Sequence, residues 1–197
     1  MGEHGQNDLF LTPSEICEKL LQVPIGHHYL ILYTDLGVMR RVYSEYVKGQ
    51  IEADPNSIIV LLPFYDSTVK VREVLESNKI DVKKHELEGT LITIDILKVI
   101  NNEYYGVSDV ERLRAFTRQI GDNHPDKTLF VIADMSAFHL LRKPLQLLEH
   151  ERTLHKDLKI EKWKELCFYN ERDFKIMFTE EQADELLEYH KDRVITM

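Results

Sequence analysis

Four aspartates of this sequence stand where apolar segments end, a position that can bring carboxylates to a binding site. Asp35, Asp66 and Asp134 each follow such a segment, and Asp95 lies at the end of another. In open α/β sheets, ligands bind outside the carboxyl ends of the strands. If the apolar segments form a parallel sheet, these acids share one edge with Tyr65, and that edge suits a cation or a neutral polar ligand better than a bare phosphate. The alternative is that each aspartate caps the helix that follows it.

The segment Thr128–Asp134 carries a second possible chemistry. An apolar strand that ends in aspartate resembles a Walker B segment, whose carboxylate holds a magnesium ion in ATPases. Turns that leave a sheet also favour aspartate, so Asp134 has a purely structural interpretation as well. In a divergent nucleotide-binding protein, Asp134 would hold the Mg²⁺ of a bound ATP, and Arg40 or Arg41 would replace the lysine of the phosphate loop.

The phosphate loop itself is missing from the sequence. The GxxxxGK[ST] motif, whose glycines let backbone N–H groups surround the phosphates, occurs nowhere in the chain. The turn Thr34–Gly37 after the first apolar segment has one glycine and places Asp35 where an anion would sit. We therefore interpret Asp35 as a helix N-cap. The sequence argues against a standard phosphate-loop ATPase and contains no complete catalytic constellation.

Two histidine patterns resemble ligand sites at first sight. In His150–His155 the histidines are five positions apart rather than the four of a zincin motif, so on a helix they diverge by about 140°. We therefore expect a solvated helix face at this segment. His27 and His28 precede an apolar segment, where one is expected in the core and the other exposed. Cys17 has apolar neighbours at helical spacing and is expected in the core.

The composition fits one α/β domain in a reducing cytoplasm. The chain has 197 residues, of which 43% are hydrophobic and 30% charged, so a core is possible and disorder is not expected. No apolar run reaches the roughly 18 residues of a membrane helix, and the first residues do not resemble a signal peptide. Cys17 and Cys167 are far apart, which does not suggest a disulfide framework. A net charge of −9 argues against direct binding to nucleic acid.

Strand and helix patterns alternate along the chain. The apolar runs predicted as strands are Tyr29–Tyr33, Ser57–Leu62, Leu91–Ile94, Thr128–Ile132 and Leu166–Tyr169. Helical patterns separate them, with start signals at Thr12, Ser108 and Thr179 and a stop at Gly121. This alternation predicts a doubly wound, mainly parallel α/β domain over residues 12–197. Residues 1–11 are predicted to form a flexible tail.

Several segments together resemble the MEDS family, the sensory domain found in the dichloromethane-dehalogenase repressor and in regulators of methylotrophs and methanogens. The first strand begins with a histidine, as His28–Tyr33, and the run Tyr46–Ile51 resembles the family's helix that ends in a glycine before the second strand. Leu166–Asn170 resembles its C-terminal Cys-x-Tyr strand, which a phenylalanine and a late histidine follow, here Phe174 and His190. The resemblance covers most of the chain, from about His27 to Ile195.

The resemblance implies a three-layer RecA/KaiC-like fold whose degenerate phosphate loop no longer binds phosphate. It also implies a non-catalytic sensory or regulatory domain without a cofactor, which binds a small molecule or a signalling protein and signals through a partner or through self-association. A structural, homo-oligomeric interaction subunit is a further alternative. We expect the ligand site to be lined by His28, Tyr33, Asp35, Tyr65, Asp66 and Asp134. Cys167 and Tyr169 are expected either to support this site or to form part of the core.

Overall fold

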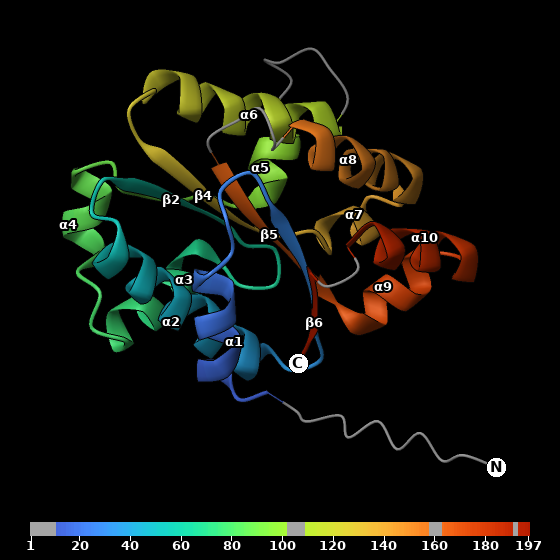
Figure 1. The fold of residues 1–197 in the computed structure, drawn as a ribbon, viewed down its shortest axis with the longest axis horizontal. Helices are drawn as coiled ribbons and strands as arrows, with labels where there is room; N and C mark the ends of the chain where they lie inside the picture. Colours follow the sequence, from blue (N-terminus) through green and yellow to red (C-terminus); the bar gives the residue numbers. More distant parts are fainter. Residues whose placement is uncertain (1–10, 102–108, 158–162, 191–192) are drawn as a thin grey trace.

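The computed structural model describes residues 11–101, 109–157, 163–190 and 193–197. Within these ranges a six-stranded sheet lies between two layers of helices (Figure 1). The tail predicted for residues 1–11 lies outside the described residues except for Leu11, and so does the helix start predicted at Ser108. Among the described residues, no helix combines the length and the apolar character that crossing a membrane requires.

Every strand of the sheet runs parallel to its neighbours, in the order β3-β2-β4-β5-β1-β6. The strands are β1 His28–Tyr33, β2 Ser57–Leu62, β3 Leu91–Thr93, β4 Thr128–Asp134, β5 Trp163–Asn170 and β6 Val194–Thr196. Helices cover both faces of the sheet, which explains why its strands are continuous apolar runs rather than alternating ones. Because all strands run in one direction, their carboxyl ends lie along one edge.

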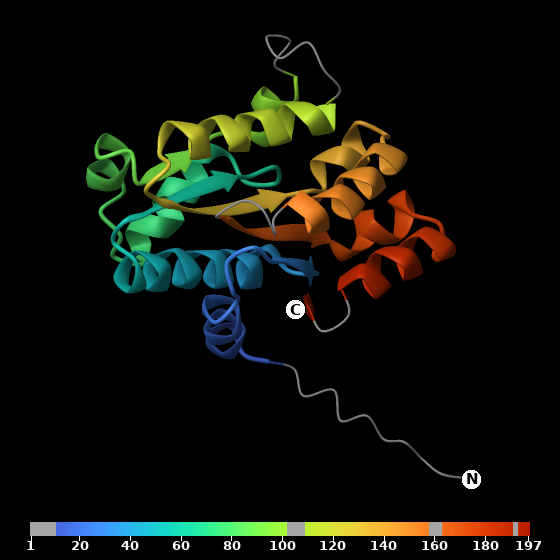
Figure 2. The same cartoon turned by 45° about the horizontal axis from the view of Figure 1, so that its top comes forward.

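One face of the sheet is covered by the helices of the first half of the chain. These helices are α1 Pro13–Leu21, α2 Leu36–Ala53, α3 Thr68–Ser77 and α4 Val82–Leu87. The predicted capping box at Thr12 is present, since its hydroxyl accepts from the Glu15 N–H and the Glu15 carboxylate accepts from the Thr12 N–H. The α1 helix packs on α2, and Figure 2 shows both below the sheet.

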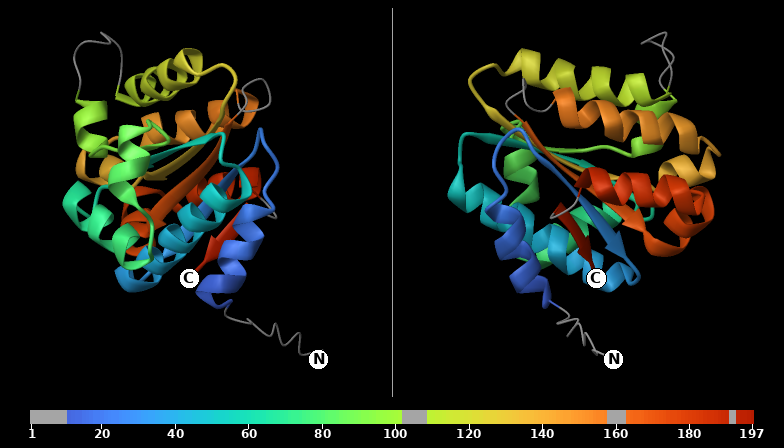
Figure 3. Two further views of the ribbon diagram at one scale, coloured as in Figure 1. Left: turned by 90° about the vertical axis from the view of Figure 1, so that its left-hand side faces the viewer. Right: turned by 45° about the vertical axis from the view of Figure 1, so that its right-hand side comes forward.

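The opposite face carries the later helices. They are α5 Ile96–Ile100, α6 Asp109–Asn123, α7 Ala137–Leu140, α8 Pro144–Asp157, α9 Glu171–Met177 and α10 Glu180–His190. Their apolar side chains form one core cluster with those of the sheet, including Leu30 of β1 and Cys167 of β5. Figure 3 shows α10 close to β1, a contact that brings the end of the chain to its first strand.

The predicted elements exist, but several boundaries differ. The strand predicted over Leu166–Tyr169 is the longer β5, and it lies in the middle of the sheet between β1 and β4. The helix predicted to stop at Gly121 continues to Asn123, and Gly49 lies inside α2, which ends at Ala53. The sequence did not predict β6 or the short helices α4, α5, α7 and α9, because such short elements contain too few residues for a periodic pattern.

Candidate functional site

Asp134, the last residue of β4, lies at the carboxyl edge of the sheet as predicted, but the chain's own donors surround it. Its Oδ2 accepts hydrogen bonds from the Tyr33 hydroxyl at 3.2 Å and from the Tyr65 N–H at 3.3 Å. Its Oδ1 accepts from the Ser136 N–H at 3.2 Å. Burial raises the pKa of Asp134 to about 6, although these hydrogen bonds act in the opposite direction. Three of the predicted site residues, Tyr33, Tyr65 and Asp134, are therefore in contact.

Asp66 lies near this group and is held by an arginine. Arg40 donates from Nε to Oδ2 at 3.0 Å and from Nη2 to Oδ1 at 2.6 Å, and the Tyr43 hydroxyl lies 3.4 Å from Oδ2. The Asp66 carboxylate is buried, and its hydrogen bond is the main cause that raises the pKa of Arg40. Arg41 is exposed on the next position of α2. The guanidinium that was predicted as a possible phosphate ligand thus already binds a carboxylate.

The other two aspartates of the edge are helix caps. Asp35 Oδ1 accepts from the Val38 N–H and caps α2, and Asp95 Oδ1 accepts from the Leu97 N–H and caps α5, both at 2.8 Å. The cavity between α2 and the sheet, which Asp66 and Asp134 line, has a volume of only about 30 Å³. That volume holds a water molecule or two but no nucleotide.

A much larger hollow opens at the same edge, on the side of α7 and α9. Its volume is about 730 Å³ and it is lined by Phe64, Tyr65, His139, Leu140, Arg142, Pro144, Asp173, Ile176 and Met177. We call it the edge hollow. The Tyr65 hydroxyl donates a hydrogen bond to Asp173 Oδ2, and His139 Nδ1 lies 3.3 Å from Asp173 Oδ1. The hollow therefore combines apolar walls with donors and acceptors, as ligand sites do.

Three polar residues of the edge hollow were absent from the predicted site. His139, Arg142 and Asp173 lie in segments with no sequence motif, and only their positions after β4 and β5 would have indicated them. Arg142 also has an unusual backbone, since its φ of 53° lies in the left-handed region. The Lys143 N–H donates to the Phe138 carbonyl at 3.2 Å and so closes the end of the helix. In helix endings of this kind, glycine is the usual residue at the position that Arg142 occupies.

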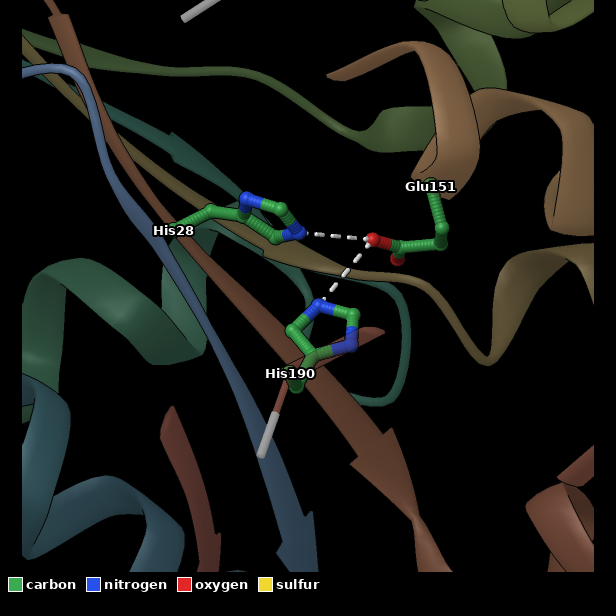
Figure 4. A group of neighbouring side chains, drawn as sticks. All are labelled: His28, Glu151 and His190. Atoms are coloured by element: carbon green, nitrogen blue, oxygen red, sulfur yellow. Dashed lines mark ion pairs between the residues drawn. The ribbon is translucent and has the colours of Figure 1, made fainter. Parts of the chain in front are cut away.

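His28 does not lie with the other predicted site residues. It is the first residue of β1, at the opposite edge of the sheet from Tyr33, and its side chain is buried. It meets Glu151 of α8 and His190 of α10 in the interior (Figure 4). The prediction of a solvated helix face at His150–His155 was wrong for His150 and Glu151, which are both buried, because this side of α8 faces β1 and β5 of the sheet.

Three side chains of this interior group point one atom each to a common centre. Glu151 Oε2 lies 3.4 Å from His28 Nε2 and 3.5 Å from His190 Nε2, and all three atoms lie within 4.8 Å of one another. The two imidazole rings meet edge to face with their centroids 4.4 Å apart. We call His28, Glu151 and His190 the buried triad. It offers a donor set, two imidazoles and a carboxylate, that binds transition metals in proteins.

Several side chains that can lose a proton lie close to the buried triad. Burial and the nearby Glu151 raise the pKa of Glu165 to about 8, and the same two causes raise the pKa of the Cys167 thiol. The Tyr169 hydroxyl donates to Glu151 Oε1. Cys167 and Tyr169 are thus core residues beside the triad, one of the two places expected for them, and they lie on the same face of β5.

The fold of the chain is that of RecA/KaiC-like proteins, as predicted. The crystal structure of a KaiC-like protein from the hyperthermophilic archaeon Pyrococcus horikoshii matches it with a TM-score of 0.55 and 16% sequence identity. The match covers 74% of this chain and 61% of that protein. The sequence matches no protein-family model and no curated protein. A three-layer α/β fold with a parallel sheet is therefore established, and the likeness at this identity concerns the fold alone.

Proposed function

We propose that the chain is a non-catalytic sensory or regulatory domain that binds a small, partly apolar molecule with an acidic group in the edge hollow. The observation that carries this proposal is the hollow itself, whose volume of about 730 Å³ is within the usual range of ligand pockets. The resemblance to the MEDS family, in which such domains sense small molecules, supports the same function. The signal would pass to a partner protein or through self-association.

Arg142 is the residue that suggests an acidic ligand. A non-glycine residue in the left-handed region costs about 1 kcal/mol of stability, so a glycine at this position would be favoured if the backbone alone mattered. Arg142 lines the hollow together with Leu140 and Ile176, each of which is about 60% exposed. This combination suits a molecule with an apolar body and one anionic end.

The contacts at Asp134 count against the alternative of a divergent nucleotide-binding protein. Its carboxylate oxygens accept from Tyr33, Tyr65 and Ser136, and the adjoining cavity of about 30 Å³ is too small for a phosphate chain. Arg40, the candidate replacement for the missing lysine, is paired with Asp66. Magnesium ATP at millimolar concentration should therefore leave the melting temperature unchanged, since a ligand raises it only by binding the folded state.

The edge hollow can be tested with an aromatic sulfonate dye of the anilinonaphthalene type, which has an apolar body and an anionic end. We expect saturable binding to the native protein, measured by fluorescence, and an affinity about tenfold or more weaker in Arg142→Gly, because a charge-assisted bond is lost. Arg142→Gly should fold at least as well as the parent, since it relieves the left-handed backbone.

Lys79→Gly is the matched control for that experiment. Lys79 has a similar φ of 65° and does not line the hollow, so the variant makes the same backbone change elsewhere. It should bind the dye with the affinity of the parent. Equal dye affinity in Arg142→Gly and the parent would contradict the proposed site, and a mass measurement that finds a stable oligomer without any ligand dependence would favour the structural-subunit alternative.

A further inference from the structure

We propose that the buried triad of His28, Glu151 and His190 is a binding site for one divalent transition-metal ion, with Zn²⁺ as the ion its donors fit best. The three ligand atoms come from β1, α8 and α10, which are far apart in the sequence. The site lies in the protein interior, where α8 and α10 meet β1, whereas the edge hollow lies at the carboxyl edge of the sheet. The proposal is thus independent of the ligand site proposed above.

The orientation of His190 gives the strongest argument. Its Nδ1 lies 2.7 Å from the Leu186 carbonyl oxygen, which only accepts, so Nδ1 carries a proton and donates. In the neutral imidazole, Nε2 then has a lone pair, and this lone pair faces Glu151 Oε2 at 3.5 Å. In that neutral form, two acceptors face one another in the protein interior. A cation between them removes the repulsion, and a backbone carbonyl that fixes the ring in this way is the usual outer partner of a metal-bound histidine.

The distances agree with a shared ion. Two ligand atoms that are each about 2.1 Å from one Zn²⁺ at a tetrahedral angle lie roughly 3.4 Å apart. The two imidazole nitrogens lie 3.4 and 3.5 Å from Glu151 Oε2. A hydrogen bond from a protonated imidazole to a carboxylate would be shorter, about 2.7–2.9 Å. The observed spacing is therefore wider than that of a charge-assisted hydrogen bond and close to that of two ligands on one metal.

Glu151 is oriented for the same purpose. Its Oε1 accepts from the Tyr169 hydroxyl, whereas Oε2 has no hydrogen bond from the described residues and faces the two histidines. A buried negative charge beside Glu165 and Cys167 is costly, and a divalent cation would neutralise it.

The donor set narrows the class of ion. Mg²⁺ and Ca²⁺ prefer oxygen ligands alone, whereas two imidazoles and one carboxylate suit Zn²⁺ and its first-row neighbours such as Fe²⁺. Three protein ligands leave one coordination position for water or another small ligand. Full burial of the three side chains implies that the ion enters as the protein folds or during a local opening.

The test measures the metal content of the full chain, expressed without a histidine tag. We expect about one equivalent of Zn²⁺ or Fe²⁺ per chain by elemental analysis. Protein stripped with dipicolinate should bind one Co²⁺, with the visible absorption bands of a tetrahedral or five-coordinate site, and its melting temperature should rise when Zn²⁺ is added. If neither the isolated nor the reconstituted parent binds metal stoichiometrically, the proposal is overturned.

Three matched variants locate the ion. His28→Gln and His190→Gln should each lose it, whereas His150→Gln should keep it, because His150 is equally buried on α8 but its ring bonds Arg114. If folded His28→Gln and His190→Gln retain the ion, it is an adventitious surface ion and the proposal fails. Should these two variants not fold, the Co²⁺ titration of the stripped parent decides. If NMR shows His190 as an imidazolium both before and after metal is added, the contact with Glu151 is a simple ion pair and the proposal fails.

Discussion

The Tyr33 hydroxyl donates a hydrogen bond of 3.2 Å to Asp134 Oδ2 and so joins the carboxyl ends of β1 and β4, although β5 lies between these strands. The carboxylate that the sequence suggested as a magnesium ligand therefore accepts a hydrogen bond from the chain itself. Because the folded protein surrounds Asp134 with low-dielectric material, the bond does not offset the cost of its charge, and its pKa rises to about 6.

This shift predicts a specific dependence of stability on pH. The folded pKa of Asp134 lies above the unfolded value of 3.8, so the folded state holds its proton more tightly and loses stability as pH rises from about 4 to about 6. The loss is complete above pH 6 and amounts to about 3 kcal/mol. Asp134→Asn does not undergo this loss, so its free energy of unfolding minus that of the parent should be about 2–3 kcal/mol larger at pH 7.5 than at pH 4, which means that the variant gains in relative stability.

Urea unfolding of both proteins across this pH range measures the effect. Asp35→Asn is the control, because Asp35 belongs to the same edge and asparagine caps a helix as well as aspartate. Parallel stability curves for Asp134→Asn and the parent would contradict the prediction.

Arg40→Ala should destabilise the protein by about 2 kcal/mol. After the substitution, the hydrogen bond to the buried Asp66 carboxylate that remains from the described residues is the long one from Tyr43, and an unpaired buried charge is costly. The loss stays below that of a fully buried pair because the Arg40 side chain is 31% exposed. Arg41→Ala, one position along α2 and exposed, should change the free energy of unfolding by less than about 0.5 kcal/mol. Equal effects of the two substitutions in chemical denaturation would refute this assignment.

Gly49→Ala should destabilise the protein by about 1 kcal/mol even though alanine favours helices. A Cβ at this position of α2 would lie 2.8 Å from Leu21 Cδ1, so the Leu21 side chain or α1 must shift, and we expect this overpacking to outweigh the helix propensity of alanine. In a Leu21→Ala background, the same substitution should become stabilising by about 1 kcal/mol. Gly121→Ala is the control. Its Cβ would lie at an ordinary distance of 3.9 Å from Trp163, so this substitution should stabilise α6. If Gly121→Ala also loses stability, the loss in Gly49→Ala cannot be assigned to overpacking against Leu21, and the prediction is contradicted.

Lys164→Met should loosen α1. The buried ammonium of Lys164 lies 2.9 Å from the Val23 carbonyl and 3.4 Å from that of Leu20, and so satisfies acceptors at the carboxyl end of this helix. Methionine keeps the apolar stem but not the donor, so the backbone amides of α1 that follow Pro13 should exchange hydrogen several-fold faster, and the global free energy of unfolding should fall by about 1 kcal/mol. Lys19→Met, which changes an exposed lysine of α1, should leave the exchange unaltered. Unchanged protection in Lys164→Met would argue that α1 is held by apolar packing alone.

The parts of the fold that the sequence predicted well are those with a local physical cause. The continuous apolar run Ser57–Leu62 is β2 with the predicted bounds, because both of its faces are buried. Thr12 and Asp35 cap α1 and α2 as predicted, since capping depends on a side chain and a backbone N–H only three residues away. The edge formed by Tyr33, Tyr65 and Asp134 followed from the parallel sheet.

The interior group was beyond such reasoning. Glu151 and His150 were assigned to solvent because charged and polar residues on a helix usually face water. Burial of Glu151 depends on His28 and His190, which lie in other elements distant from it in the sequence and approach it only when α8 and α10 pack on β1. The spacing of residues within one segment carries no information on contacts between residues of different elements.

The sequence by itself determined the alternation of strands and helices, the parallel sheet and the loss of the phosphate loop, since each depends on neighbouring residues or on a motif that is present or missing. Only the tertiary structure decided that Asp134 is enclosed, that Arg142 faces a hollow and that His28 meets Glu151 and His190 in the core. These relationships depend on strand order and helix packing, which arise from the burial of the whole chain rather than from any local pattern.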